Sequence, residues 1–152
     1  MSIKPPFTLA SAIKKVKVAQ DLWNSKEPAK VALAYTHNTI WRNRGCFLSG
    51  RDEVIEFLTQ KWKTEHGYRL RKELFTFRDN KIAVQFFYEW NGQSDLKGQW
   101  HRTYGMENWT YDEDGIMKKR MMCGNDIEIN EDERWFKPGV DVDSVEITEK
   151  HL

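Results

Sequence analysis

Two arginines in the C-terminal half of the sequence, Arg102 and Arg120, could bind a carboxylate or another oxyanion. Arginine stays protonated at neutral pH and cannot act as a base, but its planar fork of N–H donors matches such oxygens. Alternate positions around these arginines carry large apolar or aromatic side chains: Trp100, Tyr104, Met106 and Met122. This combination indicates a pocket for a small ligand with an apolar body and an acidic or carbonyl head.

Four long strands must position these side chains. Residue type and turn chemistry predict the strands Tyr68–Arg78, Ile82–Trp90, Gln99–Tyr111 and Ile116–Asp126. The turns between them are short, so neighbouring strands are expected to be antiparallel. Both parities of the third strand mix aromatic and polar residues, whereas a half-solvated sheet has one apolar and one polar face. We therefore expect one face to line a cavity and the other to meet a partner.

Helices precede the strands. Apolar spacing predicts helices at Leu9–Asn24, Pro28–Thr36 and Arg51–Glu65, with a short β-prone segment, Thr39–Gly45, before the third. Thr8 is the expected N-cap of the first helix, and Ser49 that of the third, with Asp52 in a capping-box position. This order indicates an α+β domain at residues 1–130, in which a cone-shaped, curved antiparallel sheet wraps about three helices around an internal pocket. The acidic residues 131–152 are expected to form an arm or tail.

Composition limits the function classes. The chain has 152 residues, 31% of them charged, yet its formal net charge is only +1, which argues against a nucleic-acid binder. No apolar run approaches the ~20 residues that span a bilayer, and the N-terminus lacks a secretory signal, so we expect a soluble cytoplasmic protein without a membrane partner. Two cysteines and four histidines show no metal-ligand spacing, and no glycine-rich phosphate loop is present. We expect neither metal nor cofactor.

Several short strings resemble a known superfamily. The order of elements, together with Thr39–Arg44, Phe86–Trp90 and Asp114–Ile116, resembles nuclear transport factor two, ketosteroid isomerase and the SnoaL-like polyketide cyclases. Trp41–Arg44, Tyr88–Trp90, Glu107–Trp109 and Asn125-Asp126 resemble an uncharacterised bacterial family within it. The resemblance covers roughly residues 8–130. It implies the cone-shaped fold and a homodimer through the outer sheet face, and relatives that are either enzymes or interaction modules.

The resemblance also implies where a catalytic acid would stand. Several catalytic relatives keep a carboxylate after the second helix, or inward on the second or last strand. Here Trp41-Arg42-Asn43 and Arg120–Cys123 contain none. Glu89 and Glu107 are expected on the face opposite the cavity. These departures weigh against isomerase and epoxide-hydrolase chemistry.

The alignment of strand ends assigns one parity to the cavity, namely Val84, Phe86, Tyr88 and Trp90, then Trp100, Arg102, Tyr104 and Met106, then Lys118, Arg120 and Met122. A slip of one residue would reverse each strand. The predicted ligand-binding residues are Trp41, Arg42, Asn43, Trp62, Phe86, Tyr88, Arg102, Tyr104, Arg120 and Met122. His101 is then the histidine expected to face another protomer.

Three alternatives stay open at this point. Arg102 could instead form an internal salt bridge with Glu89 or Glu107, because buried arginines are usually paired. The protein could be an isomerase, cyclase or hydratase if Asp126, Glu89 or Glu107 points inward as a base, or if Tyr104 and Tyr88 polarise a carbonyl group. It could also be a non-catalytic interaction module, which needs no base.

Overall fold

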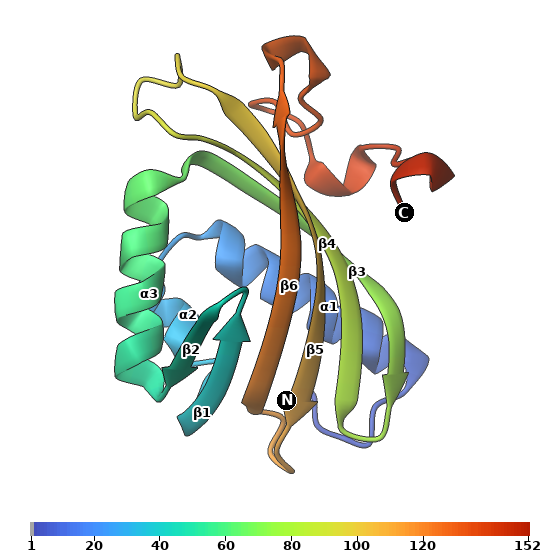
Figure 1. The fold of residues 1–152 in the computed structure, drawn as a ribbon. Helices are drawn as coiled ribbons and strands as arrows, with labels where there is room; N and C mark the ends of the chain where they lie inside the picture. The colour runs from blue at the N-terminus through green and yellow to red at the C-terminus, as the bar shows by residue number, and fades with distance from the viewer. Residues whose placement is uncertain (1) are drawn as a thin grey trace.

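The structure, a computed structural model, describes residues 2–152 (Figure 1). Its helices are α1 (Leu9–Asn24), α2 (Pro28–Ala32) and α3 (Arg51–Thr64). Its strands are β1 (Tyr35–Asn43), β2 (Cys46–Ser49), β3 (His66–Arg78), β4 (Lys81–Asn91), β5 (Trp100–Tyr111) and β6 (Met117–Ile129). Three short 3₁₀ turns follow, at Glu131–Glu133, Val142–Ser144 and Glu149–His151. The α+β class and the four long strands are confirmed.

The six strands form one curved sheet in the order β2-β1-β6-β5-β4-β3 (Figure 1). The four long strands are antiparallel neighbours, as predicted, but β1 runs parallel to β6, so the sheet is mixed. One local prediction was wrong and one strand was not predicted. The second helix ends at Ala32 because Tyr35 already pairs with Met117 of β6, and Cys46–Ser49 returns as a separate strand, β2.

The helix ends show how local sequence sets the fold. Thr8 caps α1 as predicted, in a reciprocal capping box with Ser11. The N-cap of α3 is Gly50 and not the predicted Ser49; its φ of 84° lies in the left-handed region that favours glycine. The carboxylate of Glu53 accepts a hydrogen bond from the Ser49 backbone N–H at 2.6 Å.

The inward face of the sheet packs on the helices and forms the core. On β4 the predicted residues Val84, Phe86, Tyr88 and Trp90 do face inward. Together with Ile82 they pack in one cluster with Ala12 and Val16 of α1. Register then fixes β5, because Val84 pairs with Glu107 and Phe86 pairs with Gly105. The inward residues of β5 are therefore His101, Thr103, Gly105, Glu107 and Trp109.

The predicted parity of β5 is accordingly wrong, and with it the positions of Arg102 and Tyr104. Both lie on the outer face, on the side opposite Arg120. His101 lies on the inward face, where its ring stacks on Trp90 with 4.2 Å between centroids, and not on the outer face through which a homodimer was expected. The inward face of β5 could not be predicted by aligning the ends of the strands. It is determined by the pairing of β5 with β4, which is continuous from Lys81 to Asn91.

A glycine on β5 makes room for an aromatic ring in this core. The ring of Phe86 lies directly over Gly105, so a Cβ atom at that position would be 1.9 Å from the Cζ atom of Phe86. The close approach lets Phe86 stack parallel to Tyr88, with 5.9 Å between ring centroids. Aromatic rings thus fill the space around Phe86 and Tyr88, where the sequence predicted a pocket.

Residues 131–152, the C-terminal arm, pack against the outer face of β4 and β5. Phe136 is completely buried and contacts Phe87. Glu89 is also completely buried; its carboxylate accepts hydrogen bonds from the backbone N–H groups of Trp135 and Phe136 at 3.0 and 2.9 Å. Arg102 pairs with the same carboxylate at 2.9 Å. The alternative reading of Arg102 as one partner of an internal salt bridge is confirmed.

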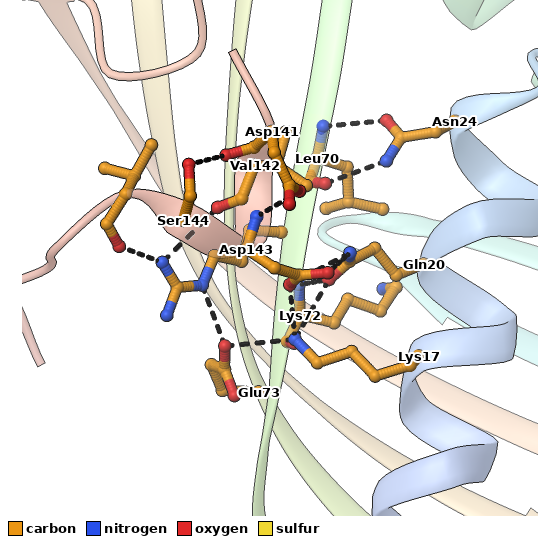
Figure 2. A network of polar contacts seen from close by, with 12 residues as sticks. Lys17, Gln20, Asn24, Leu70, Lys72, Glu73, Asp141, Val142, Asp143 and Ser144 are labelled. Atoms are coloured by element: carbon orange, nitrogen blue, oxygen red, sulfur yellow. Dashed lines mark hydrogen bonds and ion pairs between the residues drawn. The ribbon is translucent and has the colours of Figure 1, made fainter.

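The arm is also fastened to α1 and to the edge strand β3 (Figure 2). Lys17 lies 2.8 Å from Asp143 and 3.0 Å from Glu73, and Gln20 donates to Asp143. Arg71 donates to the backbone carbonyl groups of Val142 and Val145. The arm is therefore an integral part of the fold.

The arm covers only part of the outer face. Elsewhere on this face Ile40, Phe47 and Met106 are exposed. The expected homodimer stays a prediction, and the arm restricts it to this uncovered part. Within residues 2–152, no helix is long and apolar enough to span a bilayer.

Candidate functional site

A cleft of about 440 Å³ opens between α3 and the inward face of the sheet; we call it the mouth cleft. Its aromatic wall consists of Phe57, Tyr88 and Trp90. The rest of the lining is polar: Asn43, Arg44, Cys46, Gln60, Lys61, Thr64, Glu65 and Asp126. The cleft therefore combines flat apolar surfaces with hydrogen-bonding groups, as small-molecule sites do.

Arg44 and Asp126 form the main polar contact of the cleft. The Nη2 atom of Arg44 lies 2.6 Å from Oδ1 of Asp126, and the Nη1 atom donates to the carbonyl oxygen of Gly124 at 3.0 Å. Thr103 donates to the same Oδ1 at 2.5 Å. The Tyr88 hydroxyl lies 3.5 Å from Nη2 of Arg44. Residues of β4 and β6 thus hold the arginine at the rim, and Thr103 of β5 holds its partner Asp126.

The same contacts determine the protonation of Asp126. Burial raises the pKa of its carboxyl group, but the hydrogen bond from Thr103 and the pairing with Arg44 outweigh burial, and the pKa lies below its ordinary value. A general base works best with a pKa near the working pH. Asp126 is an acid that points inward, yet its surroundings suit a fixed anion better than a base.

A second ion pair closes the α3 side of the cleft. Lys61 lies 2.7 Å from Glu65, one helical turn away, and both side chains are largely buried. The Lys61 ammonium group also lies over the ring of Tyr88, 4.2 Å from its centroid. The cleft thus contains two cations and two carboxylates, and its own charges balance.

Behind the cleft lies a buried cluster, Lys72, Glu107 and Arg120, which we call the triad. Lys72 is 2.5 Å from one oxygen of Glu107, and Arg120 is 2.6 Å from the other. All three side chains are at most 3% exposed. The guanidinium group of Arg120 also lies over the rings of Trp23 and Trp41, 4.8 and 4.5 Å from their centroids. Two cations and one carboxylate leave one excess positive charge in the core.

The triad makes the stability of the protein depend on pH. Burial lowers the pKa of Lys72 from 10.5 to about 8, although Glu107 opposes the shift. Between these values the folded Lys72 is neutral while the unfolded lysine still holds its proton, so the unfolded state binds more protons and stability rises with pH. Above pH 10 the sign reverses. Burial raises the pKa of Tyr35, Tyr68 and Tyr111, so these groups lose protons on unfolding.

We therefore expect the free energy of unfolding to rise between about pH 8 and pH 10 and to fall above that range. Urea unfolding across this range, followed by tryptophan fluorescence, measures the change. Lys72→Met is the control and should remove most of the rise; the smaller part that remains comes from Lys15, whose pKa burial also lowers. A rise of equal size in the variant would assign the effect to other groups.

The structure separates the ten residues that the sequence proposed for ligand binding. Asn43 and Tyr88 line the mouth cleft, and Arg120 lies directly behind Asn43. Four apolar residues belong to the packed core or its edge: Trp41, Trp62, Phe86 and Met122. Arg42 contacts Cys123, which is exposed on the outer face. Arg102 and Tyr104, also on the outer face, contact the arm. The predicted arginine cluster does not form, because Arg102 and Arg120 lie on opposite faces.

Sequence reasoning missed most of the α3 wall of the cleft. Phe57 and Lys61 lie one turn apart on the same face of α3, and Glu65, the C-cap residue of the helix, continues the four-residue spacing. That spacing was available as a signal. Glu107 was assigned to the outer face through the parity error on β5, so its inward position is a correction. The inward acid on the last strand, Asp126, lies beyond the Arg120–Cys123 segment where the resemblance placed it.

Comparisons with known proteins agree with this architecture. Residues 5–137 match the family model described as "Protein of unknown function (DUF1348)". No curated protein matches the sequence significantly. Among solved structures, the chain is similar to SalBIII, an epoxide hydrolase/cyclase-like enzyme in pyran ring formation in the polyether salinomycin. The TM-score is 0.66 at 12% identity, over 76% of this chain and 92% of SalBIII.

Two further solved structures have the same fold. A hexachlorocyclohexane dehydrochlorinase (LinA) Type2 matches with a TM-score of 0.64 at 15% identity, over 86% of this chain and 95% of its own. A hypothetical protein from Catenulispora acidiphila with a ketosteroid isomerase-like fold matches with a TM-score of 0.63 at 8% identity, over 72% and 84%. Identities this low show the fold alone.

Proposed function

We propose, from the premise that the chain belongs to the DUF1348 family of unknown function and has the ketosteroid isomerase-like fold, that it binds a small organic molecule in the mouth cleft. The ligand has an apolar body and a carbonyl or carboxylate head. The observation that carries the proposal is the meeting of the aromatic wall, Phe57, Tyr88 and Trp90, with the N–H donors of Arg44 and Asn43 in one cleft. An arginine fork and an amide both suit an oxygen acceptor.

The charges support a head that accepts hydrogen bonds. Within the cleft, Arg44 is balanced by Asp126 and Lys61 by Glu65. The excess positive charge of the triad lies behind the floor and remains uncompensated. In a low-dielectric interior this charge favours a negative or partly negative group at the floor.

Binding fits this chemistry better than proton abstraction. Asp126 already accepts two short hydrogen bonds and has a lowered pKa, so it is a weak base. Glu107 is buried between two cations, which outweigh burial and hold its pKa below the ordinary value. The function proposed is therefore ligand binding, with Arg44 as the rim donor.

Substitution of Arg44 tests the proposal. With 1-naphthoate as the probe, we expect Arg44→Gln to weaken binding roughly tenfold or more, because the variant loses a charged donor and leaves the Asp126 carboxylate unpaired beside the ligand. Isothermal titration calorimetry gives the dissociation constants. Arg42→Gln is the matched control; it removes the same charge two residues away, on a side chain that contacts Cys123 instead of the cleft.

The two variants distinguish the possible outcomes. Loss of affinity in Arg44→Gln with an unchanged constant in Arg42→Gln supports the mouth cleft as the site. Equal losses in both would indicate a general effect of net charge. No binding of 1-naphthoate to the wild-type protein would contradict the ligand chemistry proposed.

A further inference from the structure

The floor of the mouth cleft contains an amide whose orientation is fixed from behind. Asn43 is the last residue of β1, pairs with Met122 of β6 and is 9% exposed. Its Oδ1 atom accepts a hydrogen bond from Nη1 of Arg120 at 3.0 Å. Its Nδ2 group has no acceptor among residues 2–152 and is not enclosed, since the side chain lines the cleft. The amide thus bridges the triad and the cleft.

Arg120 allows only this orientation. A guanidinium group can donate hydrogen bonds but cannot accept them, so only the oxygen of an amide can face it. If the Asn43 amide were rotated by half a turn, its NH₂ group would oppose the N–H of Arg120 in the buried interior, which leaves two donors unpaired. The oxygen therefore faces Arg120, and the NH₂ group faces the cleft.

Arg120 itself has little freedom. Its Nε and Nη2 atoms lie 2.7 and 2.6 Å from one oxygen of Glu107, whose other oxygen is held by Lys72. Its guanidinium group also packs against the rings of both Trp23 and Trp41. The triad therefore fixes the amide and also adds an excess positive charge behind it.

We propose that Asn43 determines the head-group specificity of the mouth cleft, with Arg120 as its positioning residue. The amide N–H group donates to a carbonyl or carboxylate oxygen of the ligand. Ammonium heads are rejected, because they would meet a donor with positive charge behind it. This inference rests on the proposed function and assigns its selectivity to one side chain.

Asn43→Asp is the direct test, because the new carboxylate has nearly the same shape and still accepts from Arg120, while its second oxygen presents an acceptor to the cleft. The probes share a naphthalene body: 1-naphthoate, the neutral ketone 1-acetonaphthone and 1-naphthylmethylammonium. We expect the wild-type protein to prefer the first two over the ammonium probe by roughly tenfold or more. In Asn43→Asp the preference should reverse.

Asn125→Asp is the matched control, since it makes the same chemical change and the same change in net charge at an exposed position on the outer face of β6. It should retain the wild-type preference. A melting temperature close to that of the wild type would show that Asn43→Asp is folded. If that variant does not fold, the wild-type protein gives a second test: the side-chain amide NMR signals of Asn43 should shift with 1-naphthoate and not with the ammonium probe.

The outcomes separate this inference from the proposed function. Binding of 1-naphthoate with an unchanged preference in Asn43→Asp, or with unshifted Asn43 side-chain signals, overturns the role of Asn43 and leaves the cleft as a binding site. Binding of none of the three probes to the wild-type protein overturns both.

Discussion

Replacing Glu107 by glutamine should lower the free energy of unfolding by about 3–5 kcal/mol, the cost of leaving buried charges without their partner. Glu107 is the carboxylate of a cluster with two cations, and both lie within 2.6 Å of it. A glutamine keeps the shape, but its single oxygen cannot accept from both cations, and its NH₂ group would oppose one of them. Urea unfolding of variant and wild type at pH 7 measures the difference.

Two controls make this result specific. Glu128→Gln removes the same charge at an exposed position of β6 and should change stability by less than about 0.5 kcal/mol. Lys72→Met removes the excess cation while the pair of Glu107 and Arg120 remains, so it should cost far less than Glu107→Gln. Equal losses in Lys72→Met and Glu107→Gln would contradict the view that the cluster carries one cation too many.

Glu89→Gln should have a comparable effect, again about 3–5 kcal/mol, and should also release the C-terminal arm. The Glu89 carboxylate accepts from Arg102 and from the backbone N–H groups of Trp135 and Phe136. An amide has one acceptor oxygen in place of two, so at least one of these buried donors loses its partner. Urea unfolding measures the stability, and trypsin cleavage after Arg134, which is buried while the arm is in place, measures the release.

Glu146→Gln is the control for this variant, because Glu146 lies in the arm with its side chain exposed. It should leave both stability and the rate of cleavage unchanged. A destabilised Glu89→Gln protein whose arm stays resistant to trypsin would show that the arm is held by other contacts, such as those of Lys17 and Arg71 (Figure 2).

The order of elements could be predicted from the sequence because it depends on local signals. Thr8 with Ser11 marks the start of α1, and the short turn at Asp79-Asn80 makes β3 and β4 antiparallel. The parallel pairing of β1 with β6 could not be predicted in the same way. It joins segments about 80 residues apart, and neither segment carries a turn that would fix the pairing.

The candidate site was harder to predict because it depends on the face that each strand turns inward. The parity of β4 was evident from its apolar residues, whereas β5 carries polar residues on both faces. Its inward Glu107 is paired with Lys72 of β3 and Arg120 of β6. Its outward Arg102 is paired with Glu89 of β4 and contacts the arm. Such charges look exposed in a sequence because their partners lie far away along it.

The most direct test of small-molecule binding in the mouth cleft is an NMR titration of the isotope-labelled protein with 1-naphthoate. The indole N–H of Trp90, which donates to Thr103 at 3.2 Å beside Asp126, should shift on binding, together with the side-chain amide of Asn43. The indole N–H of Trp135, in the arm on the outer face, should remain unchanged. Shifts confined to Trp135 and the outer face, or no shifts at all, would contradict a binding site in the mouth cleft.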